Sequence, residues 1–429
     1  MCFKIIKEAE QNLMKRSITT AFLLSIISLL SLSAQLQLSD SAKINLMTVS
    51  PWTGAVYSLY GHTVLRVVDD STGVDAAFNY GYFDSSQPNF LLKFIKGETD
   101  YVLGVTSYQD FLNENQMKGL EVVEQQLNLT AEQTQKLWED LYINSLPENR
   151  SYRYNFLFDN CATRPRDMVE NIIKNPVIYP PTQSNKTFRD LIHECVKEFT
   201  WMKFGIDLVI GADADKYITD REKMFLPNYL MEAFADANVL KQDNTRMPLV
   251  LSTEIVLDAD DKEVNNGEWF NVEPIVIAFA LLLVTLIVSF FQVRFNHYKT
   301  ARIYDTILFS IAGIAGIIVT FLVFFSEHPV VSPNWNLVWL HFIHLLFAVL
   351  FWVKSMKKGV YYYHFINFAV LSLFLLSWYF IPQQLPWATI PFVMNLWMRS
   401  GTNFYIDRKD FLRNKQFKSA KYMQAAWRP

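Results

Sequence analysis

Long apolar runs alternate with short polar loops in the second part of the chain, whereas the first part mixes apolar and polar residues. From residue 274 onward the apolar runs cover residues 274–293, 303–325, 337–353, 360–381 and 387–398. A helix that crosses a membrane needs about 20 apolar residues. The pattern therefore predicts an α-helical membrane domain of about five spans.

A separate apolar run at residues 21–32 is too short to span a membrane. Basic residues precede it and small residues follow it, which is the pattern of a secretory signal peptide. We therefore assign residues 1–34 to a signal peptide and expect residues 35–252 to form an exported domain.

Within the exported domain, alternating apolar and polar residues predict a β-hairpin over residues 61–83, with turn-forming residues at its centre. Pairing Val68 with Gly73 places His62 opposite Asn79. This expectation depends on the register of the two strands.

Three further elements are predicted from local patterns. Thr130 and Gln133 have the spacing of a capping box at the start of a helix. Apolar residues at helical spacing over residues 188–202 predict a single amphipathic helix, with Cys195 on its apolar side. The aromatic residues 152–158 predict a strand-like approach to Cys161.

The distribution of charge orients the chain in a membrane. Residues 35–273 contain 21 Lys and Arg against 36 Asp and Glu, whereas residues 274–429 contain 14 against 4. Alternate loops of the membrane domain are basic, and the loops at 326–336 and 382–386 have no Lys or Arg. Because basic loops stay in the cytoplasm, we expect an exported N-terminal domain and a cytoplasmic C-terminus. An acidic exported domain also argues against a nucleic-acid partner.

These patterns give a complete domain assignment. A periplasmic domain at residues 35–252 is followed by a linker at 253–273, membrane spans at 274–398 and a basic cytoplasmic tail at 399–429. We expect the protein to be a multi-pass protein of a bacterial inner membrane.

The chemistry-bearing residues of the exported domain are a cysteine and a histidine. Cys161 lies in a polar run at the expected start of a helix, where unpaired N–H groups lower the pKa of a thiol. Pro165 fits only the first helical turn, so the helix begins at or after Ala162. His62 follows Gly61 on a strand, where no bulky neighbour blocks a partner. We predict a nucleophilic thiol with an imidazole base.

The alternative for Cys161 is a disulfide bond with Cys195, the other cysteine of the exported domain. Extracytoplasmic compartments favour disulfides. However, Cys195 falls on the apolar stripe of its predicted helix, where a cysteine behaves as a small buried apolar residue. We therefore predict that Cys161 is the free, reactive thiol.

Other groups are expected to complete the site. Asn79 is the candidate for orienting the imidazole of His62. The oxyanion donors are expected to be the backbone N–H of Cys161 with either Asn160 or Tyr60. No metal ion or other cofactor is expected.

Several charged residues have simpler interpretations. Arg164 forms either a structural ion pair or a contact with a lipid phosphate. Asp213 and Asp215 are expected to lie in a solvated turn, and His193 on the polar side of its helix. Intramembrane polar residues usually face the interior of a bundle, so we expect His341, His344, His364 and Asn367 to form interhelical hydrogen bonds. The loop at 326–336 is expected to contact the exported domain from below.

The segments around His62, Asn79 and Cys161 resemble the permuted NlpC/P60-like, papain-like thiol enzymes, whose lecithin-retinol acyltransferase branch also has an Asn-Cys pair. The whole arrangement, with several spans and an exported Pro-Asn-Trp-Asn loop, resembles the Lnb family of lipoprotein N-acyltransferases of Bacteroidota. The resemblance implies an α+β papain-like domain in front of the spans. It also implies transfer of an acyl chain from a phospholipid to the N-terminal amine of a diacylglyceryl-cysteine lipoprotein, with Cys161 as nucleophile and His62 as base.

Two other functions are compatible with the sequence. One is a membrane-tethered thiol hydrolase that cuts cell-wall peptides. The other is a non-catalytic binding module on a membrane anchor, which the presence of both Cys161 and His62 argues against. A hydrolase is expected to open a polar cleft, and an acyltransferase an apolar groove towards the bilayer.

Overall fold

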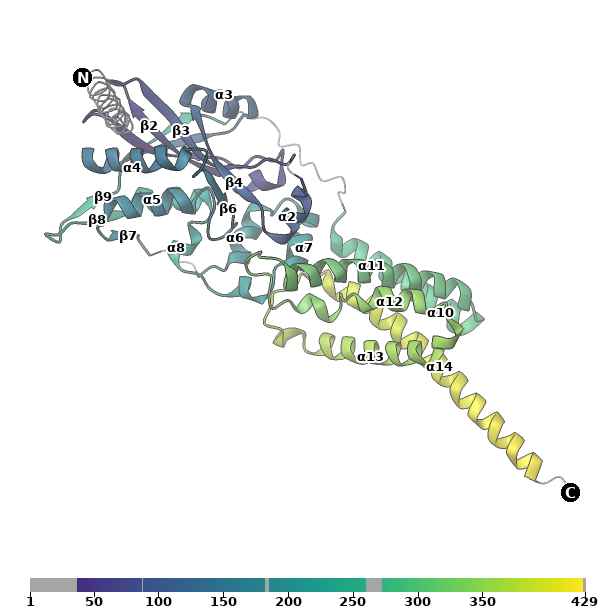
Figure 1. Cartoon of the computed structure of the whole chain (residues 1–429). Coiled ribbons are helices and arrows are strands. Elements are labelled where there is room, and N and C mark those ends of the chain that lie inside the picture. Colours follow the sequence, from purple (N-terminus) through teal and green to yellow (C-terminus); the bar gives the residue numbers. More distant parts are fainter. Residues whose placement is uncertain (1–36, 87, 182–184, 260–271, 427–429) are drawn as a thin grey trace, which may run out of the picture.

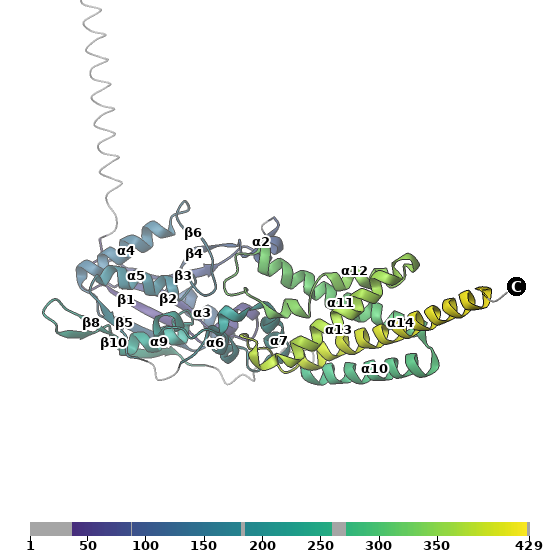
Figure 2. The same cartoon turned by 90° about the horizontal axis from the view of Figure 1, so that it is seen from below.

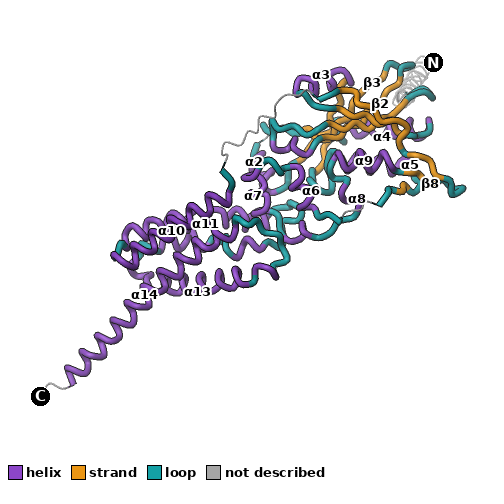
Figure 3. The backbone as a smooth tube through the Cα atoms, turned by 180° about the vertical axis from the view of Figure 1, so that it is seen from behind, coloured by secondary structure: helices purple, strands orange, loops and turns teal. Residues whose placement is uncertain are grey.

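The computed structural model describes residues 37–426 except 87, 182–184 and 260–271 (Figure 1). The expected signal peptide at 1–34 and residues 260–271 of the expected linker lie outside the described residues. The described chain forms a mixed α/β domain and, at one end of it, a bundle of long helices. Figure 3 shows all the strands gathered in the N-terminal domain and only helices and loops in the bundle.

An antiparallel sheet, with strands of different lengths, forms the centre of the α/β domain. Its seven strands have the order β10 (Val250–Leu257), β5 (Val122–Leu127), β1 (Lys43–Val49), β2 (His62–Asp69), β3 (Val74–Tyr82), β4 (Asp100–Ser107) and β6 (Ser151–Arg153). A second, small sheet consists of β7 (Val177–Ile178), β8 (Asn238–Leu240) and β9 (Arg246–Pro248).

Helices cover both faces of the large sheet because its central strands have apolar residues on both sides. Leu46, Leu65 and Phe78 pack with α4, α5 and α9 on one face. Met47 and Val64 pack with α3 on the other. The helices of this domain are α2 (Phe90–Lys96), α3 (Tyr108–Lys118), α4 (Ala131–Ser145), α5 (Thr163–Ile173), α6 (Phe188–Cys195), α7 (Thr200–Val209), α8 (Asp220–Lys223) and α9 (Pro227–Asp236), with short 3-10 turns at Val56–Tyr60 (η1) and Ala212–Asp215 (η2).

The predicted hairpin is confirmed, but its predicted register is wrong by two residues. Val68 pairs with Asp75, and Asn79 pairs with Val64 rather than with His62. Gly73 has a φ of 75° and donates its N–H to the carbonyl of Asp69, so it closes the turn instead of entering the strand. A shift of two residues leaves every side chain on its predicted face.

Other local predictions have mixed outcomes. The capping box of Thr130 and Gln133 is confirmed at the start of α4. The helix predicted over residues 188–202 is two helices, α6 and α7, joined by a turn at 196–199. The apolar stripe continues through this turn because Val196 and Phe199 pack together with Leu59, so the periodicity did not show the break.

The boundaries predicted around the aromatic run and the linker also change. Only Ser151–Arg153 of the aromatic approach to Cys161 is a strand. Residues 253–257, which we assigned to the linker, form the second half of β10 and pair with β5. The periplasmic domain therefore extends beyond residue 252.

The helical bundle contains α10 (Pro274–Phe295), α11 (Tyr298–Phe325), α12 (Ile343–Leu350), α13 (Lys357–Leu376) and α14 (Thr389–Ala426). Among the described residues, three helical segments have the length and apolar composition to cross a membrane, at Pro274–Phe295, Tyr298–Phe325 and Lys354–Leu376. The predicted third span is a shorter apolar segment, Trp335–Leu350. The last predicted run, residues 387–398, lies mostly in the first part of the 38-residue helix α14.

Buried polar residues join the helices of the bundle. Arg399 of α14 is fully buried, with its Nε 2.5 Å from Oδ1 of Asp305 in α11. The assignment of Arg399 to the basic tail is therefore wrong, because the residue is part of the bundle interior. The expected interhelical hydrogen bonds are present for His344, which bonds to the hydroxyl of Tyr363, and for Asn367, which donates to Ser400.

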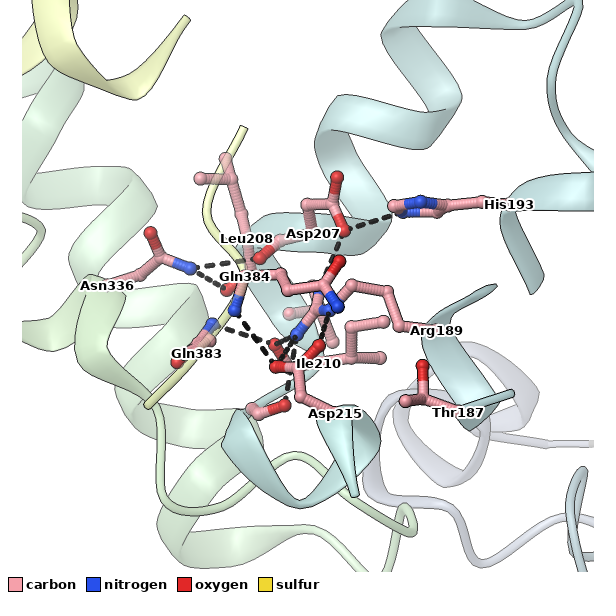
Figure 4. A network of polar contacts seen from close by, with 12 residues as sticks. Thr187, Arg189, His193, Asp207, Leu208, Ile210, Asp215, Asn336, Gln383 and Gln384 are labelled. Carbon is pink, nitrogen blue, oxygen red and sulfur yellow. Dashed lines mark hydrogen bonds and ion pairs between the residues drawn. The ribbon is translucent and has the colours of Figure 1, made fainter. Parts of the chain in front are cut away.

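The α/β domain is fixed to the bundle by a network around Arg189 (Figure 4). This fully buried side chain of α6 forms ion pairs with Asp207 at 2.5 Å and Asp215 at 2.7 Å. His193 bonds to Asp207 at 2.8 Å. The solvated positions predicted for His193 and Asp215 are thus wrong, because His193 bonds to the buried Asp207 and Asp215 is paired with Arg189 and contacted by Gln384 of the bundle.

Two loops of the bundle complete this junction. Asn336 donates to the backbone carbonyl of Asp207 at 2.9 Å, and the backbone N–H of Gly211 donates to the carbonyl of Val330 at 2.7 Å. From the second loop, Gln383 donates to the carbonyl of Ile210 at 3.0 Å. The predicted contact of the loop at 326–336 with the exported domain is confirmed.

Candidate active site

Asn160 determines the position of Cys161 at the start of α5. Its Oδ1 accepts the backbone N–H groups of Ala162 and Thr163, at 2.8 and 2.9 Å. Its Nδ2 donates to the carbonyls of Phe156 and Phe225, at 2.7 and 2.9 Å. An amide nitrogen has two hydrogens, so the side chain has none left for an oxyanion. The donor role expected of the Asn160 side chain is therefore wrong, and the residue instead shapes the turn that carries the thiol.

His62 lies at the start of β2 and reaches both Asn79 and Cys161. Its Nε2 is 2.6 Å from Oδ1 of Asn79, and its ring is hydrogen-bonded to the thiol of Cys161. Because Asn79 occupies Nε2, the ring nitrogen left for the thiol is Nδ1. The structure therefore brings these three residues together, although Asn79 is the diagonal and not the direct cross-strand neighbour of His62.

Two glycines border His62, and Gly81 leaves space for the imidazole. A Cβ on Gly81 would lie 2.8 Å from Cε1 of His62. Gly61, just before His62, has a φ of 76°, in the left-handed region that favours glycine. A side chain at Gly81 would displace the ring from Asn79, whereas a Cβ at Gly61 would lie 3.0 Å from the carbonyl oxygen of Val49.

The electrostatics of the pair favour a thiolate and an imidazolium. Burial by itself disfavours both charged forms, but the charge of each partner and the hydrogen bond between them outweigh it. As a result the pKa of the Cys161 thiol is lowered and the pKa of His62 is raised. The backbone N–H of Thr63 also bonds to the Cys161 sulfur and lowers its pKa.

Cys195 has the opposite environment. Burial, with a smaller effect from the charge of Glu194, raises the pKa of its thiol to about 12. Both Cys161 and Cys195 are free, so the disulfide alternative does not describe this structure. Of the two thiols, Cys161 is the one whose surroundings favour a nucleophile.

Two cavities meet at His62. A small one of about 70 Å³ contains Cys161 and is lined mainly by aromatic rings: Tyr57, Tyr60, Tyr80, Phe83, Tyr101, Tyr154, Phe156 and Phe225. A larger one of about 410 Å³ lies towards α3 and is lined by Asn79, Glu114 and Lys118 among others. His62 and Phe83 line both. A group bound in either cavity therefore has access to the same imidazole.

The remaining predicted site residues have different environments. Tyr60 lines the small cavity, and burial raises the pKa of its hydroxyl far above the usual value, so the hydroxyl stays protonated and able to donate. Arg164 pairs with Asp159, with 2.8 Å between its Nη2 and Oδ2, and its guanidinium lies 3.8 Å from the centre of the Tyr152 ring. These contacts favour the structural interpretation of Arg164.

Sequence reasoning missed several parts of the site. The space provided by Gly81 and the aromatic lining around Cys161 were not predicted, although the clusters of aromatic residues at 80–83 and 152–158 are visible in the sequence. Glu114 was also missed, and its negative charge contributes to the raised pKa of His62. It lies on α3, and no local pattern relates that helix to β2.

Replacement of Asn79 is expected to change the pH dependence of the site. The thiolate–imidazolium pair exists above the lowered pKa of Cys161 and is lost as the pH rises through the raised pKa of His62. Asn79→Ala removes a hydrogen bond that raises the pKa of His62. In the pH–rate profile of this variant, we expect the alkaline decline at lower pH than in the unchanged protein. We also expect kcat/KM to be reduced about ten- to hundredfold.

Asn79→Asp provides the matched comparison, because a carboxylate at the same place raises the pKa of His62 further. Its alkaline limb is expected at higher pH than that of the unchanged protein. The pH profile of kcat/KM measures both shifts. If the alkaline limb were unchanged in both variants, or shifted in the same direction in both, Asn79 would not act on His62.

The fold and the site define a class: a membrane protein that carries a Cys–His pair on a mixed α/β domain above its helical bundle. Residues 33–192 match the sequence model of the Lnb N-terminal periplasmic domain, and residues 265–410 match that of the Lnb transmembrane domain. The chain belongs to the Lnb family. The comparisons with curated proteins and with solved structures find no match.

The matched segments include the candidate site and the helical bundle. His62, Asn79 and Cys161 all lie within the periplasmic-domain match, and all of α10 to α13 lie within the transmembrane match. Residues 193–264, between the two matches, contain α7 and β10 and provide Asp207 and Asp215 of the junction.

Proposed function

We propose that this protein is a thiol-dependent lipoprotein N-acyltransferase. The acyl chain comes from a phospholipid, is held as a thioester on Cys161, and is transferred to the N-terminal amine of a diacylglyceryl-cysteine lipoprotein. The observation that supports this most strongly is the hydrogen-bonded pair of Cys161 and His62 in an aromatic cavity. Membership of the Lnb family supports the same chemistry.

In the first half-reaction the Cys161 thiolate attacks the carbonyl carbon of a phospholipid ester. A C–S bond forms and the C–O bond to the glycerol breaks. The imidazolium of His62 gives its proton to the leaving alkoxide, which departs as lysophospholipid. The backbone N–H of Cys161 and the hydroxyl of Tyr60 are the candidate donors to the oxyanion.

In the second half-reaction the neutral amine of the lipoprotein attacks the thioester carbon. A C–N bond forms, the C–S bond breaks, and His62 takes the amine proton. The thiolate–imidazolium pair is thereby restored. A thioester reacts readily with amines, but water competes, so the aromatic lining of the small cavity favours transfer over hydrolysis.

The proposed arrangement places the site on the periplasmic side of an inner membrane. In this arrangement α10, α11, the segment at 335–350, α13 and α14 are the five spans, and the C-terminus is cytoplasmic. The loops that contact the α/β domain have no Lys or Arg, as the positive-inside rule requires of exported loops.

Mass spectrometry of a lipopeptide product tests the proposal. The purified full chain is reconstituted in nanodiscs with phospholipid and a synthetic diacylglyceryl-cysteine peptide. We expect a third acyl chain in amide linkage at the peptide N-terminus, with one lysophospholipid formed per product. Release of fatty acid without acylated peptide, or cleavage of a cell-wall peptide in its place, would support the hydrolase alternative instead.

A further inference from the structure

Helix α2 is a short, exposed, apolar and basic element of an otherwise acidic domain. Leu91 is 69% exposed, Leu92 51% and Phe94 49%. The helix contains Lys93 and Lys96 and no acidic residue. Exposed apolar side chains beside lysines are typical of segments that lie in the interface of a membrane.

The position of α2 is fixed by the end of a candidate span. The backbone N–H of Glu327 donates to the carbonyl of Lys96 at 2.7 Å, and Nε2 of His328 bonds to the carbonyl of Phe94 at 2.9 Å. These two residues follow α11, which ends at Phe325, after the capping residue Ser326. Figures 1 and 2 show α2 at the junction of the two domains, beside α11. It therefore lies at the end of a helix that has the length and apolar composition to cross a membrane.

A series of aromatic rings connects α2 with the cavity of Cys161. The ring centres of Phe94 and Phe90 are 6.1 Å apart, and those of Phe90 and Phe83 are 5.7 Å apart, both stacked. Phe83 lines the cavity that contains Cys161. Tyr57, which is 63% exposed, also contacts Phe83 and lines this cavity. Contacting aromatic rings thus extend from α2 to the cavity that contains Cys161.

We propose that Leu91, Leu92 and Phe94 of α2 form the surface on which a phospholipid of the outer leaflet docks, and that Phe90 and Phe83 lead its acyl chain to Cys161. Lys93 supplies positive charge beside these residues, which matches the phosphate of the lipid, whereas Lys96 is paired with Glu98 at 3.4 Å. The proposal rests on the proposed function in one respect, namely that a phospholipid is the acyl donor.

Photocrosslinking tests the docking surface independently of catalysis. A benzophenone amino acid replaces Leu91 in the full chain, in nanodiscs of phosphatidylethanolamine and phosphatidylglycerol. We expect crosslinks to phospholipid, identified by mass. The control position is Leu251, which is 55% exposed in β10 at one edge of the sheet, away from α2. Crosslinks at Leu91 no more frequent than at Leu251 would overturn the proposal.

A rate measurement tests the path to the thiol. Leu91→Glu with Leu92→Glu is expected to slow acylation of Cys161 by nanodisc phospholipid at least about tenfold, since each change removes the burial of an apolar side chain. Acylation by a water-soluble short-chain thioester should stay within about twofold, as should both reactions in Leu251→Glu. An equal loss of acylation rate with both donors, or no loss of rate with phospholipid, would contradict the proposed path from α2 to Cys161.

The two tests separate this inference from the proposed function. Lipid crosslinks at Leu91 without any acylation of Cys161 support the docking surface and reject the acyltransferase. Acylation of Cys161 that is insensitive to the changes in α2 supports the acyltransferase and rejects the docking surface.

Discussion

Cys161→Ser and His62→Ala are each expected to reduce lipopeptide acylation by about three orders of magnitude or more. The serine hydroxyl ionises far less readily than the thiol. The Cys161→Ser variant therefore lacks the thiolate that the charge of His62 favours in Cys161. His62→Ala removes both this charge and the proton donor for the leaving alkoxide. Initial rates of N-acylated lipopeptide formation in nanodiscs measure both losses.

Cys195→Ala is the matched control for the loss of a thiol. Its sulfur is partly buried in an apolar cluster, so the change is expected to cost on the order of 1 kcal/mol of stability and less than about twofold in rate. Cys161 and His62 act as one catalytic unit. The double variant Cys161→Ser with His62→Ala should therefore be no less active than either single variant. If Cys195→Ala were as inactive as Cys161→Ser, the assignment of the nucleophile would be wrong.

Arg189→Met is expected to destabilise the junction of the two domains by about 3–5 kcal/mol. The change leaves Asp207 and Asp215 buried without their cation, and both are under a tenth exposed. It also removes two hydrogen bonds to backbone carbonyls, those of Ile210 and Gly211. Thermal unfolding of the full chain in detergent, followed by tryptophan fluorescence, measures the loss.

Two comparisons isolate the unpaired charge as the cause. Arg153→Met breaks ion pairs to Asp100 and Glu327 that are about half exposed, so its cost should be below about 1 kcal/mol. Arg189→Met in a background of Asp207→Asn and Asp215→Asn should cost less than in the unchanged chain, since no bare carboxylate remains. If Arg189→Met cost the same stability in both backgrounds, the loss would result from packing and not from the unpaired carboxylates.

The catalytic pair could be predicted from the sequence because its residues are scarce and their local surroundings are informative. The exported domain has one cysteine in a polar run and one on an apolar stripe, and their predicted roles follow from that difference. Asn79 was found despite a wrong register, because the hairpin was misaligned by two residues and kept its faces. An error of one residue would have pointed Asn79 away from His62.

Contacts distant in the sequence could not be predicted. Asp215 and His193 look like solvated polar residues, but Asp215 pairs with the fully buried Arg189 and accepts a hydrogen bond from the backbone of Gln384, and His193 bonds to the buried Asp207. Asn160 looked like an available donor, but Phe225, 65 positions later, accepts one of its hydrogens. Arg399 resembled the first residue of a basic tail until its pairing with Asp305 placed it inside the bundle.

The central claim is that Cys161 carries the acyl group between donor and acceptor, and intact-mass spectrometry tests it most directly. The purified full chain is incubated in phospholipid nanodiscs without any lipopeptide. We predict a mass increase of one acyl chain that maps to Cys161, is removed by hydroxylamine, transfers to lipopeptide added later, and does not form in Cys161→Ser. Lipopeptide acylation with no adduct on Cys161, or undiminished acylation in Cys161→Ser, would contradict it.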